Sequence, residues 1–391
     1  MVIEGGLSQL SSPVVLDAGS DAVRCGFAHD QGPRYVFPSV VGWTPKSQIQ
    51  EDKEKFCYVG SESQNKAKML NLTYPIQNGQ ISNFENIEKL FDHMYEELTI
   101  SSKYQPVLMT QHILNSIKNK ENTAQMMFEN FEVPGLYLEF QNPLALYSSG
   151  HKTGVSIDAG HSGVTVVPVN DGVCVKEASK HTPVGGRVLT DYLADMYSRR
   201  GYDITLETVR QIKESLCYVS NDFSEEMQTG GCEFIFDKTY QLPDGQEVNI
   251  ESERFYCPEG LFSPELLGVN KDGIHKIAHD SILQCHEILQ KELFANILMT
   301  GGTSICKGFK ERLFSELKKL APKSHPMSKI NPDFRNRTAT NITDTKTKEG
   351  YAMNAVWIGG SILVSLNDFQ HMWITKQEYE EKGSYIISKR C

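Results

Sequence analysis

The sequence VVLDAGS at residues 14–20 is echoed later in the chain by VSIDAGHS at residues 155–162. In each copy a short apolar run leads into Asp-Ala-Gly, and a second apolar run follows, at residues 24–28 and 164–169 respectively. Two such runs joined by a tight, glycine-containing turn are typical of a β-hairpin. The repeat therefore predicts two similar halves, each with such a hairpin.

The segments around these hairpins alternate between helical and strand patterns. Apolar residues spaced three and four apart predict three amphipathic helices, and the apolar run at 296–300 predicts a buried strand that leads into Gly301 and Gly302. Alternating strands and helices indicate an α/β fold. The apolar residues of the three helices are Ile87, Leu90, Phe91, Met94 and Leu98, then Val188, Leu189, Tyr192, Leu193 and Met196, then Phe309, Leu313, Leu317 and Leu320.

The composition is that of a globular protein, with 39% hydrophobic and 23% charged residues among 391. The net charge of −10 lacks the basic excess of nucleic-acid-binding proteins, so we expect no direct contact with nucleic acid. No apolar run reaches the ~18 residues of a membrane span, and no secretory signal pattern is visible, which predicts a soluble intracellular protein. The nine scattered cysteines contain no Cys-x-x-Cys pair and predict reduced thiols.

The two Asp-Ala-Gly turns have the residues that a nucleotide phosphate tail requires. A glycine lets backbone N–H groups approach phosphate oxygens, serine adds a hydroxyl donor, and aspartate suits a hydrated Mg²⁺. Gly301 and Gly302 provide a third point of close approach, on the adenosine side. Ordinary hairpin turns without a ligand are the alternative reading of each turn. The residues of the two turns are Asp17, Gly19 and Ser20, and Asp158, Gly160 and Ser162.

From about Val14 to Cys391 the chain resembles actin and the actin-related proteins. The matching stretches occur in order and near the expected spacing. They are DAGS (17–20), FPSVVG (37–42), YPI (74–76), RQIKESLCYV (210–219), YQLPDG (240–245), TGGT (300–303), VWIGGSIL (356–363) and MWITKQEY (372–379). The resemblance identifies the chain as a divergent member, closer to an actin-related protein than to a conventional actin.

The resemblance implies a two-lobed α/β fold with a nucleotide cleft between two duplicated domains, a fold shared with sugar kinases and the chaperone ATPase domain. It places the first lobe at residues 1–150, with a loop at 43–57, and the second at 151–355, with a polar insertion at about 323–350. Residues 356–391 would return to the first lobe. A sugar kinase needs a carboxylate base aimed at a substrate hydroxyl, and a full-length chaperone needs a substrate domain; the sequence has neither signature.

The resemblance also implies ATP or ADP with Mg²⁺ or Ca²⁺ in the cleft, and it assigns roles position by position. Asp17 and Asp158 match the acidic residues that hold the metal through water, and Gln141 matches the glutamine that orients the attacking water. The phosphate-side positions are Gly19, Ser20, Asp21, Ala22 and Arg24 in the first turn and Gly160, His161, Ser162 and Gly163 in the second. The remaining positions are Gly186 in the cleft lining, Lys213 and Glu214 near the base and ribose, and Gly301, Gly302 and Thr303 near the adenosine.

Several of these positions depart from the family pattern. Asp21 stands where glycine is common and would place a carboxylate beside phosphate, and His161 replaces an acidic residue. Thr165 takes the place of the histidine that helps to position the attacking water. Cys306 and Met353 replace larger or charged residues near the base. These changes predict nucleotide binding with slow or absent hydrolysis.

Two loops bear on whether the protein forms filaments. In actin-type filaments an apolar-tipped loop enters the next subunit, but the stretch at 43–57 contains EDKEK at 51–55, and the stretch at 267–273 is also largely polar. With the polar insertion, these loops predict a structural subunit of a heteromeric cytoskeletal assembly. A divergent self-polymerising actin with ATPase activity is the alternative.

The predicted partners are other subunits of such an assembly, including actin or actin-related proteins. An amphipathic helix would dock in a groove marked by the apolar residues Tyr147, Ile362, Leu363 and Leu366, unless these belong to the core. Without an obvious basic import cluster, the cytoplasm and its cytoskeleton are the expected location. The sequence leaves open which complex contains the protein, including an axonemal or nuclear one.

Overall fold

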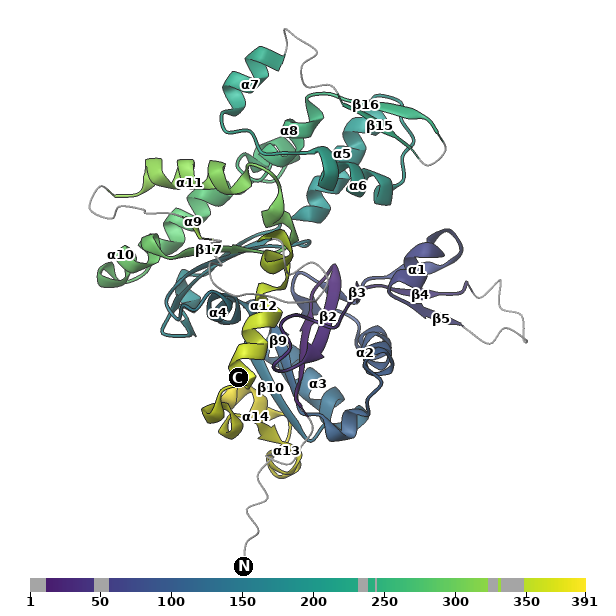
Figure 1. Ribbon diagram of the computed structural model, residues 1–391, viewed down its shortest axis with the longest axis vertical. Coiled ribbons are helices and arrows are strands. Elements are labelled where there is room, and N and C mark those ends of the chain that lie inside the picture. Colours follow the sequence, from purple (N-terminus) through teal and green to yellow (C-terminus); the bar gives the residue numbers. More distant parts are fainter. Residues whose placement is uncertain (1–11, 46–55, 231–237, 243–244, 323–329, 332–347) are drawn as a thin grey trace, which may run out of the picture. The chain divides into compact units, whose positions relative to one another are not determined.

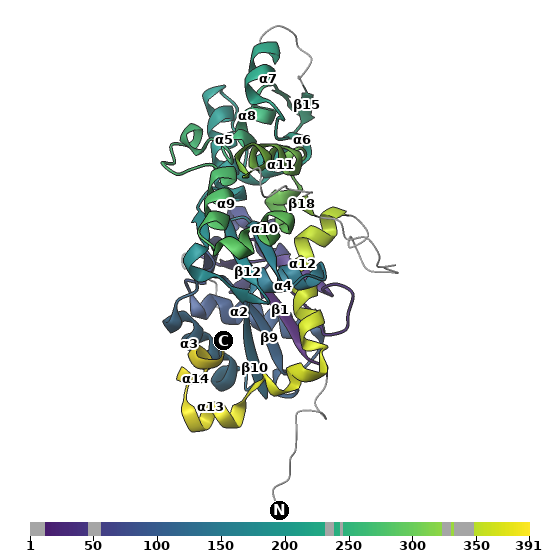
Figure 2. The same cartoon turned by 90° about the vertical axis from the view of Figure 1, so that its left-hand side faces the viewer.

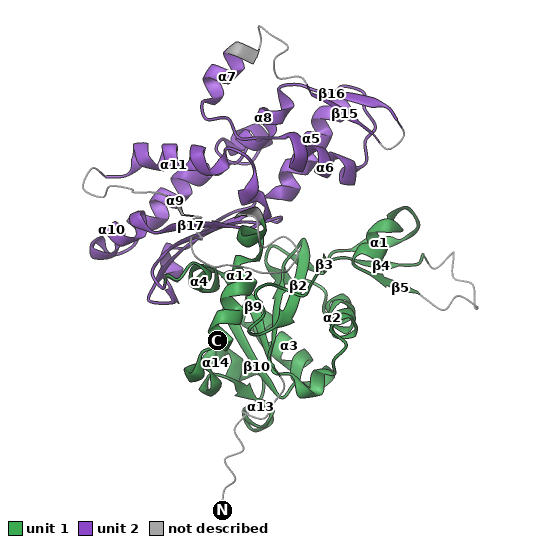
Figure 3. Ribbon diagram, in the orientation of Figure 1, with its two compact units in different colours: residues 1–151, 335–391 green, residues 152–334 purple. Residues whose placement is uncertain are grey.

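The computed structural model describes residues 12–45, 56–230, 238–242, 245–322, 330–331 and 348–391. The chain divides into two compact units, unit 1 with residues 1–151 and 335–391 and unit 2 with residues 152–334 (Figure 3). The charge run at 51–55 and most of the polar insertion at 323–350 lie outside the described residues.

A six-stranded sheet forms the centre of unit 1, with the strand order β19-β10-β9-β1-β2-β3 (Figure 1). β1 and β2 pair antiparallel, which confirms the first predicted hairpin, and β9 lies parallel to β1 on its other side. β10 continues the parallel order, and β19 closes that edge antiparallel. The strands are β1 (Val14–Ala18), β2 (Ala22–Phe27), β3 (Tyr35–Pro38), β9 (Val107–Gln111), β10 (Gly135–Phe140) and β19 (Ile374–Thr375).

The first predicted helix is α2 (Phe84–Leu98) of unit 1. All five apolar residues of its predicted face are buried, as the three- and four-residue spacing requires. The helix begins where the Asn83 side chain accepts a hydrogen bond from the backbone N–H of Asn86, and it ends at Thr99 in the left-handed conformation. The sheet and α2 share one hydrophobic core.

Two helices of unit 1 lie in close contact, α4 (Gln141–Ser148) and α12 (Lys348–Val364) (Figure 2). A Cβ on Gly359 would overlap the backbone oxygen of Leu144, so only glycine permits this approach. Trp357 is fully buried in the same helix, and its Nε1–H donates to Val15 O at 2.9 Å. The Gly-Gly pair of the C-terminal motif thus fixes α12 against α4 and the central sheet.

Smaller elements complete unit 1. A three-stranded sheet has the order β5-β4-β6, with α1 beside it, and β7 and β8 form a short hairpin. α14 packs against α3 at the C-terminal end of the chain. The bounds are β4 (Val41–Trp43), β5 (Cys57–Val59), α1 (Ser61–Asn65), β6 (Asn71–Thr73), β7 (Ile76–Gln77), β8 (Gln80–Ile81), α3 (Ile117–Gln125), α13 (Lys376–Lys382) and α14 (Tyr385–Arg390).

Unit 2 has its own sheet, with the order β13-β12-β11-β17-β18 and with β14 also paired to β12. β11 and β12 form the second predicted hairpin, and the predicted buried strand is β17, parallel to β11. The hairpin and its parallel neighbour therefore repeat the arrangement of β1, β2 and β9 in unit 1. The strands are β11 (Gly154–Ala159), β12 (Val164–Asn170), β13 (Val173–Cys174), β14 (Lys180–Thr182), β17 (Ile297–Thr300) and β18 (Ile330–Asn331).

The other two predicted helices are α5 (Gly186–Arg199) and α11 (Phe309–Leu320) of unit 2. Leu189 and Leu193 of α5 are buried, whereas Leu320 at the end of α11 is 39% exposed. The helices pack around one core with the sheet. The remaining elements are α6 (Leu206–Leu216), α7 (Phe223–Gly230), β15 (Lys238–Gln241), β16 (Glu247–Ile250), α8 (Glu253–Glu259), α9 (Ile274–Leu283) and α10 (Glu287–Ala295).

The chain returns to unit 1 earlier than the sequence analysis placed it. A boundary between residues 355 and 356 would divide α12, but this helix runs unbroken from Lys348 to Val364 and belongs to unit 1. Ala352 and Ala355 at its beginning are already buried. Because a packed helix moves as one body, the second unit ends before α12.

Candidate functional site

Asp17 lies at the end of β1 and is 5% exposed. Its Oδ1 accepts hydrogen bonds from the Thr110 hydroxyl at 2.6 Å and from Gln141 Nε2 at 3.2 Å. Arg24 stands directly opposite on β2, with its guanidinium 3.8 Å from Asp17 Oδ2 and its Nε donating to Asn354. Unit 1 thus brings Asp17, Gln141 and Arg24 together, all three of them predicted site residues.

The first glycine turn follows directly. The Gly19 N–H donates to Ala22 O at 3.0 Å, which closes the turn between β1 and β2. A Cβ on Gly19 would lie 3.2 Å from that same oxygen, so a larger residue would press on the turn. The backbone oxygen of Asp21 accepts a hydrogen bond from the Ser39 N–H, which helps to hold this residue in place. Ser20 lies between these positions at the tip of the turn.

Unit 2 repeats the pattern around Asp158, at the end of β11. The Thr300 hydroxyl on the parallel strand β17 donates to Asp158 Oδ1 at 3.3 Å, as Thr110 on β9 does to Asp17. The Gly160 N–H donates to Gly163 O at 2.9 Å and closes the second turn around His161 and Ser162. Each predicted metal-holding aspartate therefore has a threonine partner on the neighbouring parallel strand.

Gly301 comes directly after β17 and lies against the same aspartate. Its φ of 87° favours glycine, and a Cβ there would lie 2.6 Å from Asp158 Oδ1. A Cβ added to Gly302 would have no atom within 4 Å, so the space around this residue is open. The two glycines differ accordingly: the first is required by the backbone, and the second is not.

Four predicted residues of unit 2 meet beside the second turn. Gly186, at the start of α5, donates its N–H to Gly160 O at 3.0 Å, and the Thr303 hydroxyl donates to the same oxygen at 2.9 Å. Lys213 of α6 donates from Nζ to Gly186 O at 2.7 Å and to the Thr190 hydroxyl at 2.8 Å. Burial lowers the pKa of Lys213.

Two predicted residues lie apart from this cluster. The side chain of Glu214 is exposed and accepts a hydrogen bond from Arg210 Nε at 2.9 Å along α6. It points away from its neighbour Lys213 because consecutive helical residues point about 100° apart. Cys306 packs against the core of unit 2, and burial raises the pKa of its thiol to about 12. Its sulfur lies 4.0 Å from Cys217 O. Cys306 is therefore a partly buried thiol packed against the core of unit 2.

Sequence reasoning missed the polar partners of the two aspartates. Thr110 and Thr300 each lie at or next to the last residue of an apolar strand, and both are buried. The sequence signal for these threonines is a polar residue at the end of a buried strand. Assigning each threonine to an aspartate, however, requires knowing which strands are neighbours. Thr190 and His181 were missed for the same reason, since their contacts also join different elements.

The carboxylates of Asp17 and Asp158 are groups that fit a hydrated hard cation, although the Gln141 amide nitrogen and the Arg24 guanidinium face the carboxylate of Asp17. Carboxylate, hydroxyl and amide oxygens are the groups that Mg²⁺ and Ca²⁺ prefer, and Mg²⁺ keeps much of its water. Within the described residues, no group of three or more His, Cys, Asp or Glu side chains is placed to hold a metal ion. Because Mg²⁺ keeps much of its water, a single carboxylate such as Asp17 or Asp158 is suited to a water-mediated contact.

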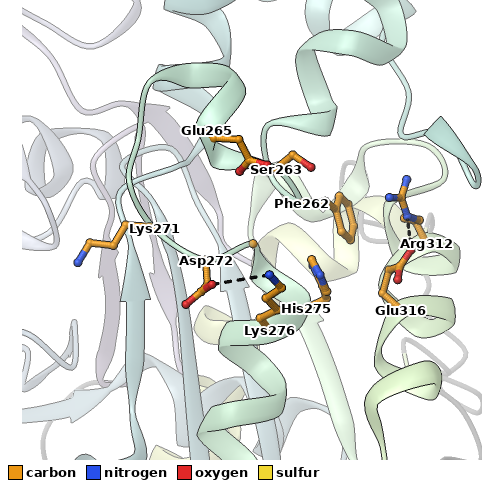
Figure 4. A pocket seen from close by; sticks show the side chains of 10 residues that line it. Phe262, Ser263, Glu265, Lys271, Asp272, His275, Lys276, Arg312 and Glu316 are labelled. Atoms are coloured by element: carbon orange, nitrogen blue, oxygen red, sulfur yellow. Dashed lines mark hydrogen bonds and ion pairs between the residues drawn. The ribbon is translucent and has the colours of Figure 1, made fainter. Parts of the chain in front are cut away.

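A separate cavity of about 240 Å³ lies in unit 2, away from the predicted site residues (Figure 4). The Phe262 ring is stacked with His275, and the Arg312 guanidinium lies over the same ring. Arg312 also pairs with Glu259 at 3.1 Å and with Glu316 at 2.8 Å, so its charge is compensated. These contacts make the cavity wall a structural junction between α8, α9 and α11.

None of the helices in the described parts of the chain has the length and apolar character needed to cross a membrane. The family model described as Actin matches the chain in two segments, residues 8–207 and 203–391. Together these segments cover nearly the whole sequence, including both hairpins and α12. The chain belongs to the actin family.

Proposed function

We propose that this actin-family protein binds ATP or ADP with Mg²⁺ or Ca²⁺ through its two Asp-Ala-Gly turns. We also propose that it acts as a structural subunit of a larger cytoskeletal assembly, with slow or absent hydrolysis. The observation that carries the proposal is the repeated arrangement: in each unit an aspartate ends a strand, a threonine on the parallel neighbour bonds to it, and a glycine turn follows.

The chemistry of the two turns supports this reading. Glycine N–H groups can donate hydrogen bonds to phosphate oxygens at close range, and a bound divalent cation would neutralise phosphate charge. Gly160 is informative, because the nearest atoms to a Cβ there are Gly163 O at 3.6 Å and Asp158 Oδ2 at 3.9 Å. The protein itself therefore leaves room for a methyl group at Gly160, and close approach of a ligand is the remaining reason for glycine.

One contact and one residue replacement support slow hydrolysis. Gln141 Nε2 is engaged with Asp17 Oδ1 at 3.2 Å, so the amide must leave this bond or share it to orient a water. Thr165 is 2% exposed and brings a hydroxyl where the family resemblance expects an imidazole. A glutamine needs a correctly placed water to support phosphoryl transfer. We therefore expect turnover far slower than that of a conventional actin.

The surface of the loop at 267–273 supports a subunit role rather than self-polymerisation. Leu267 and Val269 pack against the core of unit 2, whereas Lys271 and Asp272 are exposed. In Figure 4, Lys271 points away from the other cavity side chains. The apolar residues of this loop thus serve the fold, and a polar tip remains for contacts with partners.

The proposed docking groove for an amphipathic helix lies on unit 1. Tyr147 on α4 and Ile362 and Leu363 on α12 are half-buried, and Leu366 is 53% exposed. Partly exposed apolar side chains on two adjacent helices suit the apolar face of a partner helix.

The first experiment is chromatography of the nucleotide released when the purified protein is denatured. We expect stoichiometric ATP or ADP, and Gly160→Ala to lose it while its unfolding curve without nucleotide stays the same. Prolonged incubation of ATP-loaded protein then measures hydrolysis directly. A folded wild-type protein that releases no nucleotide and does not respond to added Mg-ATP would refute binding. Concentration-dependent sedimentation into filaments would instead favour a self-polymerising actin.

A further inference from the structure

Four polar residues form a row across four neighbouring strands of unit 2. Asp158 on β11 pairs with Thr300 on β17 and with Thr165 on β12, and Thr165 pairs in turn with His181 on β14. Residues directly opposite each other in a sheet project to the same face. The row, in the order Thr300, Asp158, Thr165 and His181, therefore lines one face of the sheet.

The adjacent positions of the two hairpin strands point the other way, into the core. Ile157 and Ala159 flank Asp158, Val164 and Val166 flank Thr165, and all four are fully buried. The alternation of apolar and polar residues thus separates a dry face from a polar face. A histidine at the end of this polar row is held in place by the register of the sheet, which fixes the face to which it points.

Direct contacts fix the His181 ring. Its Nδ1 lies 3.4 Å from the hydroxyl oxygen of Thr165. A Cβ on Gly163 would lie 2.7 Å from His181 Cε1 and 3.3 Å from Nε2. The ring therefore rests against the second glycine turn, where a Cβ would also lie 2.4 Å from the backbone oxygen of Thr182, so ring and backbone both require glycine at this position. Gly163, Thr165 and His181 form one arrangement at the end of that turn.

The order of the strands places His181 at a defined end of the proposed nucleotide site. The adenosine-side residues Gly301–Thr303 follow β17, the phosphate turn follows β11, and β14 lies beyond β12 on the opposite side. Strands lie ~4.8 Å apart, so the backbone of His181 is about 10 Å from that of Asp158. The row of four residues therefore extends from Asp158, the proposed metal-holding residue, towards the expected position of the outermost phosphate.

We propose that His181 contacts the outermost phosphate of the bound nucleotide and makes the protein discriminate ATP from ADP. This inference rests on the proposed function, because it requires a nucleotide at the two turns. His181 would supply an imidazole from β14, although the family resemblance expects one at the position of Thr165. Gly163 makes room for this displaced ring.

The chemistry of the ring fits a phosphate contact. Burial and the positive charge of Lys271, in the loop before α9, lower the pKa of His181, so the ring is neutral near pH 7. A neutral imidazole has one donor and one acceptor nitrogen. When the Thr165 hydroxyl donates to Nδ1, the proton of the ring sits on Nε2 and can be donated to a phosphate oxygen.

Calorimetry with the full-length protein tests the proposal, using Mg-ADP and a Mg-bound ATP analogue with an imido bridge between the outer phosphates. His181→Gln should weaken binding of the analogue about tenfold, the effect of one hydrogen bond to a charged group, and leave ADP within twofold. His286→Gln, on another histidine of unit 2, is the matched control and should change neither affinity. Combining Thr165→His with His181→Thr should restore analogue binding.

An NMR measurement on the wild-type protein keeps the test independent of whether a variant folds. The His181 ring signals should move when the ATP analogue is added and move much less with ADP. Signals that respond equally to both nucleotides, or equal losses of both affinities in His181→Gln, would overturn the inference while the proposed function stands. Failure of the wild-type protein to bind either nucleotide would overturn both.

Discussion

Glu139 provides a quantitative test of the electrostatics of unit 1. It lies near the end of β10, where its Oε1 accepts the Phe140 N–H at 2.8 Å. Burial raises the pKa of this carboxyl to about 7, from an ordinary value of 4.5, and the backbone hydrogen bond and the charge of Lys120 only partly oppose this effect. The folded protein therefore holds a proton on Glu139 over a range of pH in which the unfolded chain has released it.

The pKa values give the size and sign of the effect. One pKa unit corresponds to ~1.4 kcal/mol, so a rise from 4.5 to about 7 amounts to about 3 kcal/mol. Because the folded pKa is the higher one, this stabilisation is fully present below pH 4.5. It is lost progressively as the pH rises through about 7. Protonated Glu139 and glutamine are both neutral, so Glu139→Gln should remove this pH dependence.

The assay is urea unfolding of wild type and Glu139→Gln at several pH values between 4.5 and 8. The variant should gain about 3 kcal/mol of stability relative to wild type across this range, because only the wild type must bury a charge at high pH. Glu380→Gln, on the exposed surface of α13, is the control and should show a constant difference. A constant difference for Glu139→Gln as well would refute the argument that burial controls this carboxyl.

Three further predictions concern packing, charge and helix capping. Gly359→Ala should cost about 3 kcal/mol in urea unfolding, since the new Cβ overlaps the backbone of α4, whereas Gly302→Ala, with open space around it, should change stability by less than ~0.5 kcal/mol. Arg312→Met should cost ~3–5 kcal/mol by leaving the buried Glu259 carboxylate without its partner. Adding Glu259→Gln should recover part of that loss in a double-mutant cycle. Thr375→Ala breaks the capping box at the start of α13 and should lower stability by ~1 kcal/mol, measured by thermal unfolding.

The local parts of the fold were predictable from the sequence. The repeated Asp-Ala-Gly string predicted both hairpins, and spacing in the sequence predicted α2, α5 and α11. These succeed because a hairpin turn and an amphipathic face are set by neighbouring residues. No spacing pattern predicted α12, and the boundary expected between residues 355 and 356 falls inside this helix.

The candidate site was predictable only in part, because its geometry depends on which distant strands become neighbours. Asp17 and Asp158 were visible in the sequence, but their partners Thr110 and Thr300 lie 93 and 142 residues away along the chain. Glu214 shows a further limit of sequence reasoning: a motif match fixes the residue type, but the direction of the side chain and its contact with Arg210 come from the structure. His181 becomes visible only when the register of β12 and β14 is known.

The discontinuity of unit 1 has a consequence for synthesis on the ribosome. Unit 2 is one continuous stretch, residues 152–334, and all its core strands and helices can form once that stretch has emerged. Unit 1 must wait for α12, whose Trp357 covers β1, and for β19, which closes the edge at β10. Until α12 and β19 are translated, the N-terminal segment of unit 1 keeps an apolar sheet face and an open strand edge uncovered. The N-terminal segment of unit 1 is thus made before unit 2 but completed after it.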